Sequence, residues 1–267
     1  SFLTVIPVFK NLSQNNFAFL LICYCPIVVW YTVYRFGFFW AVVALIVLVL
    51  SGFLSGSRSG SLLTVSGGAL TLLLNRRSTG AIYIFALIGY LLVVSTIETK
   101  TVKNLVLSLN ERTYDLIYNR QKILTEDRSY LVRLAQIEKA MLVYEKYPLS
   151  GIGLNNFTKY KVRLPGNFEG AKYVIDKKSI DEKSAHNSYF GFLAEGGLVL
   201  FIPFFLLLFY CIVWFFMNLG KLKPANKPIF IGIIHMSIHL YFIYAILNVF
   251  AWFLIGLGCM VILKHKK

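Results

Sequence analysis

The sequence predicts an all-α, polytopic membrane protein: about seven transmembrane helices in a bundle, with one large, mostly helical loop outside the bilayer. The chain is 57% hydrophobic and has a mean hydropathy of +0.67, so it is more apolar than a soluble domain. Eleven of the twelve acidic residues fall in one polar stretch, residues 98–186, with apolar sequence on both sides. The sequence therefore predicts two groups of membrane helices, separated by one loop in the aqueous phase.

Seven apolar segments are candidates for crossing the membrane, since a span needs about 20 apolar residues. They are residues 16–34, 36–54, 59–75, 80–97, 187–217, 228–246 and 249–263. The third is short and contains Ser66-Gly67-Gly68-Ala69, and such small side chains let neighbouring helices approach closely. We expect three parts: N-terminal transmembrane helices (1–97), an extracytoplasmic loop (98–186) and C-terminal transmembrane helices (187–267).

The short basic loops predict which side faces the cytoplasm. With seven crossings, the following cations fall on one side: Arg35, Arg76, Arg77, Lys221, Lys223, Lys227, Lys264, Lys266 and Lys267. Cytoplasmic loops carry such an excess of Lys and Arg, so the polar loop 98–186 and the link around Arg58 are expected outside. The chain opens on Ser1 without a methionine, so we expect a fragment or a processed chain.

The net charge of +15 does not predict nucleic-acid binding. Sixteen of the 27 Lys and Arg residues lie in the polar loop beside the eleven acids. Most others lie at helix ends, where they set topology and meet anionic lipids. The cysteines (Cys23, Cys25, Cys211 and Cys259) lie in apolar segments and are expected to be small buried residues, without a disulfide framework or zinc spacing.

Two helices are predicted inside the polar loop, at residues 101–122 and 127–147, because apolar residues recur there at helical spacing. The second must stop at Pro148, since proline disfavours helix at the residue before it. Gly151 and Gly153 follow shortly afterwards.

Two arginines are candidates for binding an anion at the outer surface. Arg58 lies among small residues at the mouth of a short helix, and it needs a polar partner or a ligand unless it snorkels to the interface. Arg133 lies on the second loop helix with Arg128, Lys139 and Lys146, where the alternative is a solvated charged face. A diphosphate suits both, because guanidinium binds phosphate oxygens bidentately and keeps its charge.

His186 is a candidate general base, because histidine titrates near neutrality and can take a proton from an incoming hydroxyl. It ends the polar loop, just before Asn187, and the alternative is an interfacial polar residue. Glu195 lies about two and a half turns further inward and is expected to be buried as a protonated acid or paired. One partner is His235 or His239, which share a helix face but lack the glutamate of a metal-binding His-Glu-x-x-His motif, so no metal is expected.

Several short motifs occur in a fixed order along residues 55–217: Gly56-Ser57-Arg58-Ser59, Arg133, Tyr147-Pro148-Leu149-Ser150-Gly151-Ile152-Gly153-Leu154-Asn155-Asn156-Phe157, His186-Asn187-Ser188-Tyr189 and Glu195-Gly196-Gly197. In this combination the chain resembles the O-antigen ligase and O-antigen polymerase superfamily of bacterial membrane glycosyltransferases. Members usually carry more spans, so we expect that N-terminal helices are missing from this chain.

The resemblance implies a GT-C-like fold in the bacterial inner membrane, with its active site on the periplasmic side. The donor would be an undecaprenyl-diphosphate-linked glycan, transferred with inversion and without a metal or cofactor. The acceptor would be lipid A-core in a ligase, which we favour, or a lipid-linked glycan in a polymerase. By the same match, Arg58 and Arg133 bind the diphosphate, His186 activates the acceptor hydroxyl, and Asn187 and Glu195 support it.

Two alternatives come from other classes. A transporter or flippase of a lipid-linked anion would use Glu195, His235 and His239 as an intramembrane relay. Such proteins usually show repeated halves and broken helices, and the sequence indicates neither. A membrane scaffold that binds a partner through its loop would leave Arg58 and His186 without a role.

Overall fold

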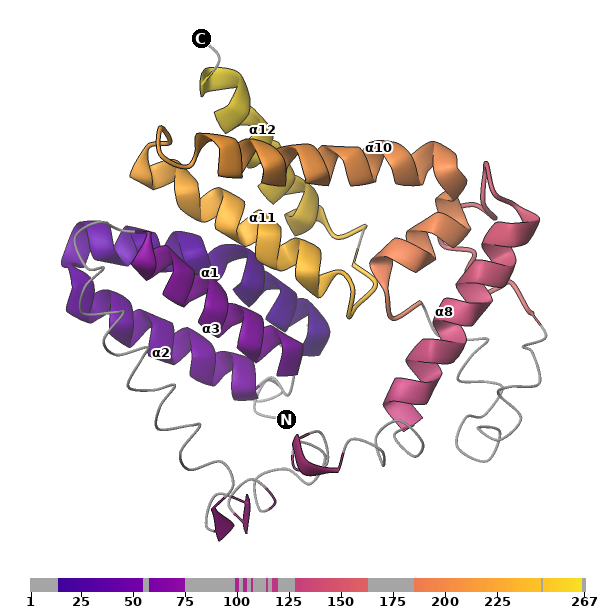
Figure 1. Ribbon diagram of the computed structural model, residues 1–267, viewed down its shortest axis with the longest axis horizontal. Helices are drawn as coiled ribbons and strands as arrows, with labels where there is room; N and C mark the ends of the chain where they lie inside the picture. The colour runs from indigo at the N-terminus through magenta and orange to yellow at the C-terminus, as the bar shows by residue number, and fades with distance from the viewer. Residues whose placement is uncertain are drawn as a thin grey trace. The chain divides into compact units, whose positions relative to one another are not determined.

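The computed structural model describes residues 14–54, 58–74, 99–100, 103–104, 107, 114, 117–119, 128–162, 185–245 and 247–265. Their helices are α1 (Gln14–Phe36), α2 (Phe38–Leu54), α3 (Arg58–Leu73), α8 (Arg128–Lys146), α10 (Ser188–Asn218), the 3-10 helix η5 (Pro224–Asn226), α11 (Lys227–His239) and α12 (Val249–His265) (Figure 1). These residues contain no strand, and the all-α prediction is confirmed for them.

Two helices in the described part of the chain are long and apolar enough to cross a membrane, Asn16–Phe36 and Ser188–Asn218. Three shorter apolar helices accompany them: Phe38–Gly52, Ser59–Leu73 and Val249–His265. Five of the expected spans therefore coincide with apolar helices, whereas the expected span 80–97 lies outside the described residues. The bundle of seven crossings stays a prediction.

The expected span at 228–246 is shorter than hydropathy indicated. Helix α11 has only 13 residues and ends at His239, which gives a length of about 20 Å at 1.5 Å per residue. Turns follow it, with the N–H of Tyr241 bonded to the carbonyl of Ile238. The apolar segment continues beyond the helix, so hydropathy alone placed its end too late.

The chain forms two compact units, one of Ser1–Ile82 with Phe201–Lys267 and one of Tyr83–Leu200. Helix α10 begins in the second unit and continues into the first. The sequence predicts domain boundaries after residues 97 and 186, where the chain is expected to enter or leave the bilayer. These boundaries stay predictions.

In the first unit α1 packs against α2, α3 and α11 (Figure 1). The small residues of α3 allow these close contacts. A Cβ on Gly68 would lie 2.3 Å from Cδ1 of Leu45, and a Cβ on Gly67 would lie 3.4 Å from Pro26 and 3.5 Å from His235. The predicted tight packing of this segment is therefore confirmed.

The two histidines of α11 lie in the interior of this unit. Nδ1 of His235 lies 2.8 Å from the carbonyl oxygen of Ile231, and the ring of His239 stacks on Phe19 at a centroid distance of 6.1 Å. The contact of His235 agrees with the hydrogen bonding expected inside the bundle, whereas the contact of His239 with Phe19 is ring stacking. Three of the four cysteines, Cys23, Cys25 and Cys211, are buried as expected, whereas Cys259 is half-buried.

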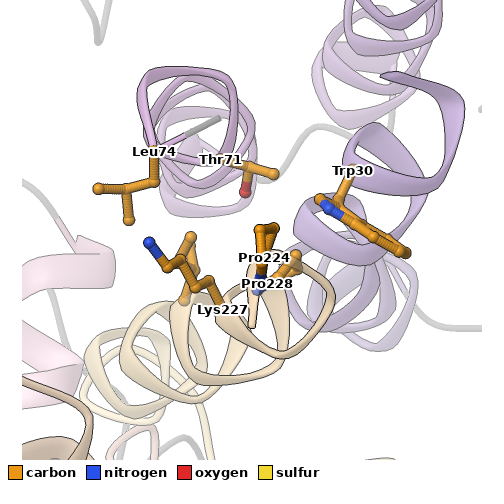
Figure 2. Close-up of a pocket in the computed structure, with 7 residues that line it drawn as sticks. Trp30, Thr71, Leu74, Pro224, Lys227 and Pro228 are labelled. Atoms are coloured by element: carbon orange, nitrogen blue, oxygen red, sulfur yellow. The ribbon is translucent and has the colours of Figure 1, made fainter. Parts of the chain in front are cut away.

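A small crevice, with room for about one water molecule, lies between α1, α3 and α11. Figure 2 shows Thr71 of α3 facing Pro224 and Pro228, with Trp30 and Lys227 at the sides. The remaining lining residues are Leu74 and Ile231. Lys227 is its one titratable side chain, so this crevice offers no acid and base pair and is not our candidate for chemistry.

Candidate active site

Helix α8 forms one wall of the second unit and runs from Arg128 to Lys146. The predicted helix at 127–147 is therefore confirmed, including its end before Pro148. Its buried apolar residues are Leu131, Val132, Ala135, Ala140 and Val143. The other predicted loop helix, residues 101–122, lies largely outside the described residues.

The 148–157 loop that follows α8 contains three residues in the left-handed backbone region. Gly151 has φ 63°, Gly153 has φ 87° and Asn155 has φ 61°. Glycine adopts this region at little cost, and asparagine tolerates it better than most residues. The loop can therefore turn twice within a few residues and run back along the start of α10.

Helix α10 is broken at Gly197, where φ is 58° and ψ is −167°, so the expectation that the chain has no broken helix is wrong. In a regular helix the N–H of Leu198 bonds to the carbonyl of Ala194, and the N–H of Val199 to that of Glu195. The break separates both pairs, so two donors and two acceptors lose their helical partners inside a buried segment. Such groups are costly unless other partners replace them.

The 148–157 loop supplies those partners. Four backbone hydrogen bonds join it to the break: Leu198 N to Pro148 O (2.9 Å), Val199 N to Leu149 O (3.1 Å), Ile152 N to Ala194 O (3.1 Å) and Gly153 N to Glu195 O (2.9 Å). The loop thus satisfies all four groups that the break releases. The start of α10 and the end of α8 are held together by this junction.

Two glycines are required at the junction because the backbones nearly touch. A Cβ on Gly151 would lie 2.4 Å from the carbonyl oxygen of Glu195, and a Cβ on Gly197 would lie 2.2 Å from that of Leu149. No side chain fits at such distances from a backbone atom. The glycines of the two sequence motifs therefore have one shared structural purpose.

Glu195 lies beneath this junction and is 2% exposed. Its Oε1 accepts a hydrogen bond of 2.9 Å from the backbone N–H of Phe157. The predicted burial of Glu195 is confirmed, and its carboxylate helps to hold the end of the 148–157 loop. His235 and His239 belong to the other unit, so the contact expected with them stays a prediction.

Lys139 is fully buried on α8, with its ammonium 4.7 Å from the ring centroid of Phe157. The interpretation of Lys139 as part of a solvated charged face is therefore wrong. A cation over an aromatic face is stabilised by the ring's negative quadrupole. Phe157 consequently contacts buried ionisable side chains from two helices, Lys139 through its ring and Glu195 through its backbone.

An exposed cluster lies where the chain leaves this junction. The ammonium of Lys146 lies 5.4 Å from the ring of Tyr147 and 5.9 Å from that of Tyr160. A hydrogen bond with Tyr160 raises the pKa of Lys146, and a hydrogen bond with Tyr147 lowers the pKa of Tyr160. The cluster ties the chain after the loop back to the end of α8.

His186, the predicted base, is half-buried next to α8. Its backbone N–H donates to Oε1 of Gln136 over 3.1 Å. Asn187 caps α10, because its Oδ1 accepts from the N–H groups of Tyr189 (3.0 Å) and Phe190 (3.2 Å). The backbone around His186 is thus fixed by a side chain of α8 on one side and by a helix cap on the other.

Two buried amide nitrogens beside His186 lack hydrogen-bond partners among the residues that the structure describes. They are Nε2 of Gln136, which is 1% exposed, and Nδ2 of Asn187, which is 3% exposed. Leaving a buried donor unpaired costs about 1–3 kcal/mol. Such groups in a native protein call for an explanation.

Two of the predicted site residues, Arg133 and His186, lie in the second unit. Arg133 is exposed on α8, one turn before Gln136, so the two are neighbours on the helix surface. It therefore shares a wall of the second unit with the Gln136–His186 contact. Arg58 begins α3 in the first unit, and its side chain lies outside the described residues.

Gln136 and Lys139 were not predicted as site residues. Both lie on buried stripes of α8, Gln136 four residues from Val132 and Ala140, and Lys139 four residues from Ala135 and Val143. A polar residue four positions from apolar neighbours on each side is the signal that could have identified them.

The described residues define an α-helical protein with membrane-length helices, in which His186 and two buried amides lie next to α8, the helix that carries Arg133. The family model for O-antigen ligase matches residues 43–205, more than half of the chain, and the chain belongs to this family. Comparison with curated proteins gives no match, and comparison with solved structures gives none either. The resemblance seen in the short motifs is thereby confirmed.

Membership of this family makes the chain a glycosyltransferase-type enzyme of the membrane, with lipid-linked glycans as substrates. The matched range includes each motif that carried the resemblance, from Arg58 to Glu195.

Proposed function

We propose that the chain transfers a glycan from undecaprenyl diphosphate to an acceptor sugar at the outer face of the bacterial inner membrane. In the reaction that we favour, the acceptor is lipid A-core, so the enzyme is a ligase. The polymerase reaction differs only in its acceptor, a second lipid-linked glycan, and is the other candidate within the family.

In the proposed mechanism, the ring of His186 removes the proton of an acceptor hydroxyl while that oxygen bonds to the anomeric carbon of the donor. The bond between the anomeric carbon and the diphosphate oxygen breaks on the opposite face, so the configuration inverts. The electron pair leaves with undecaprenyl diphosphate. Arg58 and Arg133 bind this leaving group and stabilise its growing negative charge, which is the task that a metal would otherwise have.

The observation that supports the proposal most is the hydrogen bond from the backbone of His186 to Gln136. It links the proposed base to α8, the helix that carries Arg133 one turn away. A base and a permanent cation, 53 positions apart in the sequence, therefore share one unit. Their different chemistry suits the two ends of a glycosyl transfer, proton removal and stabilisation of the leaving group.

The arginine roles can be tested by Arg58→Lys and Arg133→Lys, which keep the charge and remove the bidentate fork. Loss of one preorganised charge-stabilising donor costs about 10²-fold in rate or more, so we expect losses of that order with a defined lipid-linked donor. Arg35→Lys, on the exposed end of α1, is the matched control and should transfer normally. Full activity in both site variants would reject these roles.

The acceptor can be identified in the same assay. Purified protein with donor and lipid A-core should yield glycosylated lipid A-core, and donor alone should yield no longer chain. Elongated lipid-linked glycan without lipid A-core would instead identify the polymerase. Movement of the donor across the bilayer without any new glycosidic bond would favour the transporter alternative.

A further inference from the structure

The ring of His186 and the guanidinium of Arg133 are the first pair of polar groups in the candidate site. The buried side-chain amides of Gln136 and Asn187, next to the backbone of His186, are a second pair. Each already uses its oxygen: Oε1 of Gln136 accepts from the N–H of His186, and Oδ1 of Asn187 caps α10. Backbone N–H groups can only donate, so these bonds fix which atom of each amide is oxygen. The nitrogens are therefore placed by the backbone, and each retains two N–H donors.

Both nitrogens carry uncharged N–H donors. No acceptor for these donors is found among the described residues. Their residues adjoin one half-buried residue, His186, through a hydrogen bond and a peptide bond. In the proposed function the acceptor meets the ring of His186, so a bound acceptor lies next to the chain segments that carry both amides. In an empty enzyme, hydrogen bonds of this kind often form fully only when the substrate is bound.

The chemistry of the donors indicates which ligand they suit. A diphosphate is best held by charged donors, and the proposed function assigns it to the arginines. Uncharged amide N–H groups suit the uncharged hydroxyl and ring oxygens of a sugar. The sugar whose hydroxyl meets His186 is the acceptor.

We infer that the side-chain amides of Gln136 and Asn187 bind the acceptor sugar through its oxygen atoms next to the reacting hydroxyl. This inference rests on the proposed function, because it assumes that His186 meets an acceptor hydroxyl. Gln136 has a second task, since its oxygen positions the backbone of His186. An acceptor that lacks the matching hydroxyl would leave one of these buried donors unpaired, so it would bind less tightly.

Asn187→Ser is the sharpest variant, because serine keeps an oxygen for the helix cap and removes only the amide nitrogen. Gln136→Glu likewise keeps an oxygen for the N–H of His186 and removes the nitrogen, and it also introduces an ionisable acid at a site that is 1% exposed. With lipid A-core as acceptor, each variant should raise the acceptor KM about 3- to 10-fold, as expected for one lost hydrogen bond. The donor KM should stay unchanged.

A second measurement separates binding from a merely structural role. The wild type should prefer lipid A-core over analogues whose terminal sugar lacks one hydroxyl beside the reacting one, by about 10-fold for the contacted position. Asn187→Ser or Gln136→Glu should lose that preference at one position each. A structural defect would slow transfer to all these acceptors alike.

Asn248→Ser is the matched control, because Asn248 caps α12 in the same way, through the N–H of Phe250 at 3.0 Å. It should leave both KM values and the preference unchanged. If Asn187→Ser folds poorly, Asn187→Asp is used in its place, because aspartate also keeps an oxygen for the helix cap. The inference is overturned if well-folded variants keep the wild-type acceptor KM and acceptor preference. It is also overturned if the donor KM rises as much as the acceptor KM. Both outcomes leave the proposed function standing. No transfer by the wild type to any acceptor overturns the proposed function and this inference together.

Discussion

Phe157 is the residue that connects two buried ionisable side chains of the candidate site. Its N–H donates to Glu195 and its ring lies under the ammonium of Lys139. A buried charge without partners is costly, so charged residues are rarely buried unless they are paired or hydrogen-bonded. These contacts fix the end of the 148–157 loop, and with it the junction between that loop and α10.

Glu195 can be tested by comparing Glu195→Ala with Glu195→Gln. Alanine leaves the buried N–H of Phe157 without its acceptor, so we expect a loss of about 1–3 kcal/mol in the free energy of unfolding. Glutamine keeps an oxygen in place and should lose much less. Thermal unfolding in detergent measures both. Transfer by Glu195→Gln should stay above that of His186→Ala, whereas the reverse order would favour the intramembrane relay of a transporter.

Single site residues could be predicted where a side chain suited to the reaction also lies in or beside the polar loop. Arg133, His186 and Asn187 stand out because they lie in or beside the polar loop with functional side chains. Gln136 and Lys139 differ, because their importance comes from burial against segments that are 50 and 18 residues away, at His186 and Phe157. Helical spacing could have shown their positions on apolar stripes, but not the partners that they meet.

At the scale of elements, the junction between the 148–157 loop and α10 organises the second unit. A helix that spans 31 residues would be too long for one crossing, and it is interrupted at Gly197 before its membrane-length part. The loop then completes the backbone hydrogen bonds that the break leaves open. Two motifs that are distant in the sequence are consequently one structural feature.

Gly151→Ala and Gly197→Ala should each destabilise the second unit strongly. A left-handed backbone costs a residue with a Cβ about 1–2 kcal/mol, and the clash with a backbone carbonyl adds to this. We expect a loss of more than about 2 kcal/mol in thermal or denaturant unfolding. Gly256→Ala is the control, because Gly256 lies in α12 with open space around it. It should be neutral or stabilising, and equal effects at all three positions would contradict this account of the junction.

The ends of elements were predictable only where a local signal marks them. Pro148 ends α8 as expected, and Gly151 and Gly153 indicated a turn. The break inside 187–217 was not predictable, because the apolar run continues through it and the bonds that stabilise it come from residues about 45 positions earlier. The end of α11 was missed for a related reason, since apolar composition extends beyond the helix.

At the scale of the whole molecule, hydropathy predicted the apolar helices, and motif order predicted the family. The all-α class follows from the length and spacing of apolar segments, which are local properties. The side of the membrane on which each loop lies, and the approach of Arg58 to Arg133 and His186, depend on how helices assemble. Those two points stay predictions, and the proposed mechanism depends on both.

The central claim is that His186 removes the proton of the acceptor hydroxyl, and His186→Ala tests it most directly. The measurement is the rate of glycan transfer by purified His186→Ala from a defined lipid-linked donor to lipid A-core, with and without added imidazole. We predict a rate at least about 10²-fold below that of the wild type, with partial recovery when imidazole supplies the missing base. Transfer at the wild-type rate by folded His186→Ala would contradict the account.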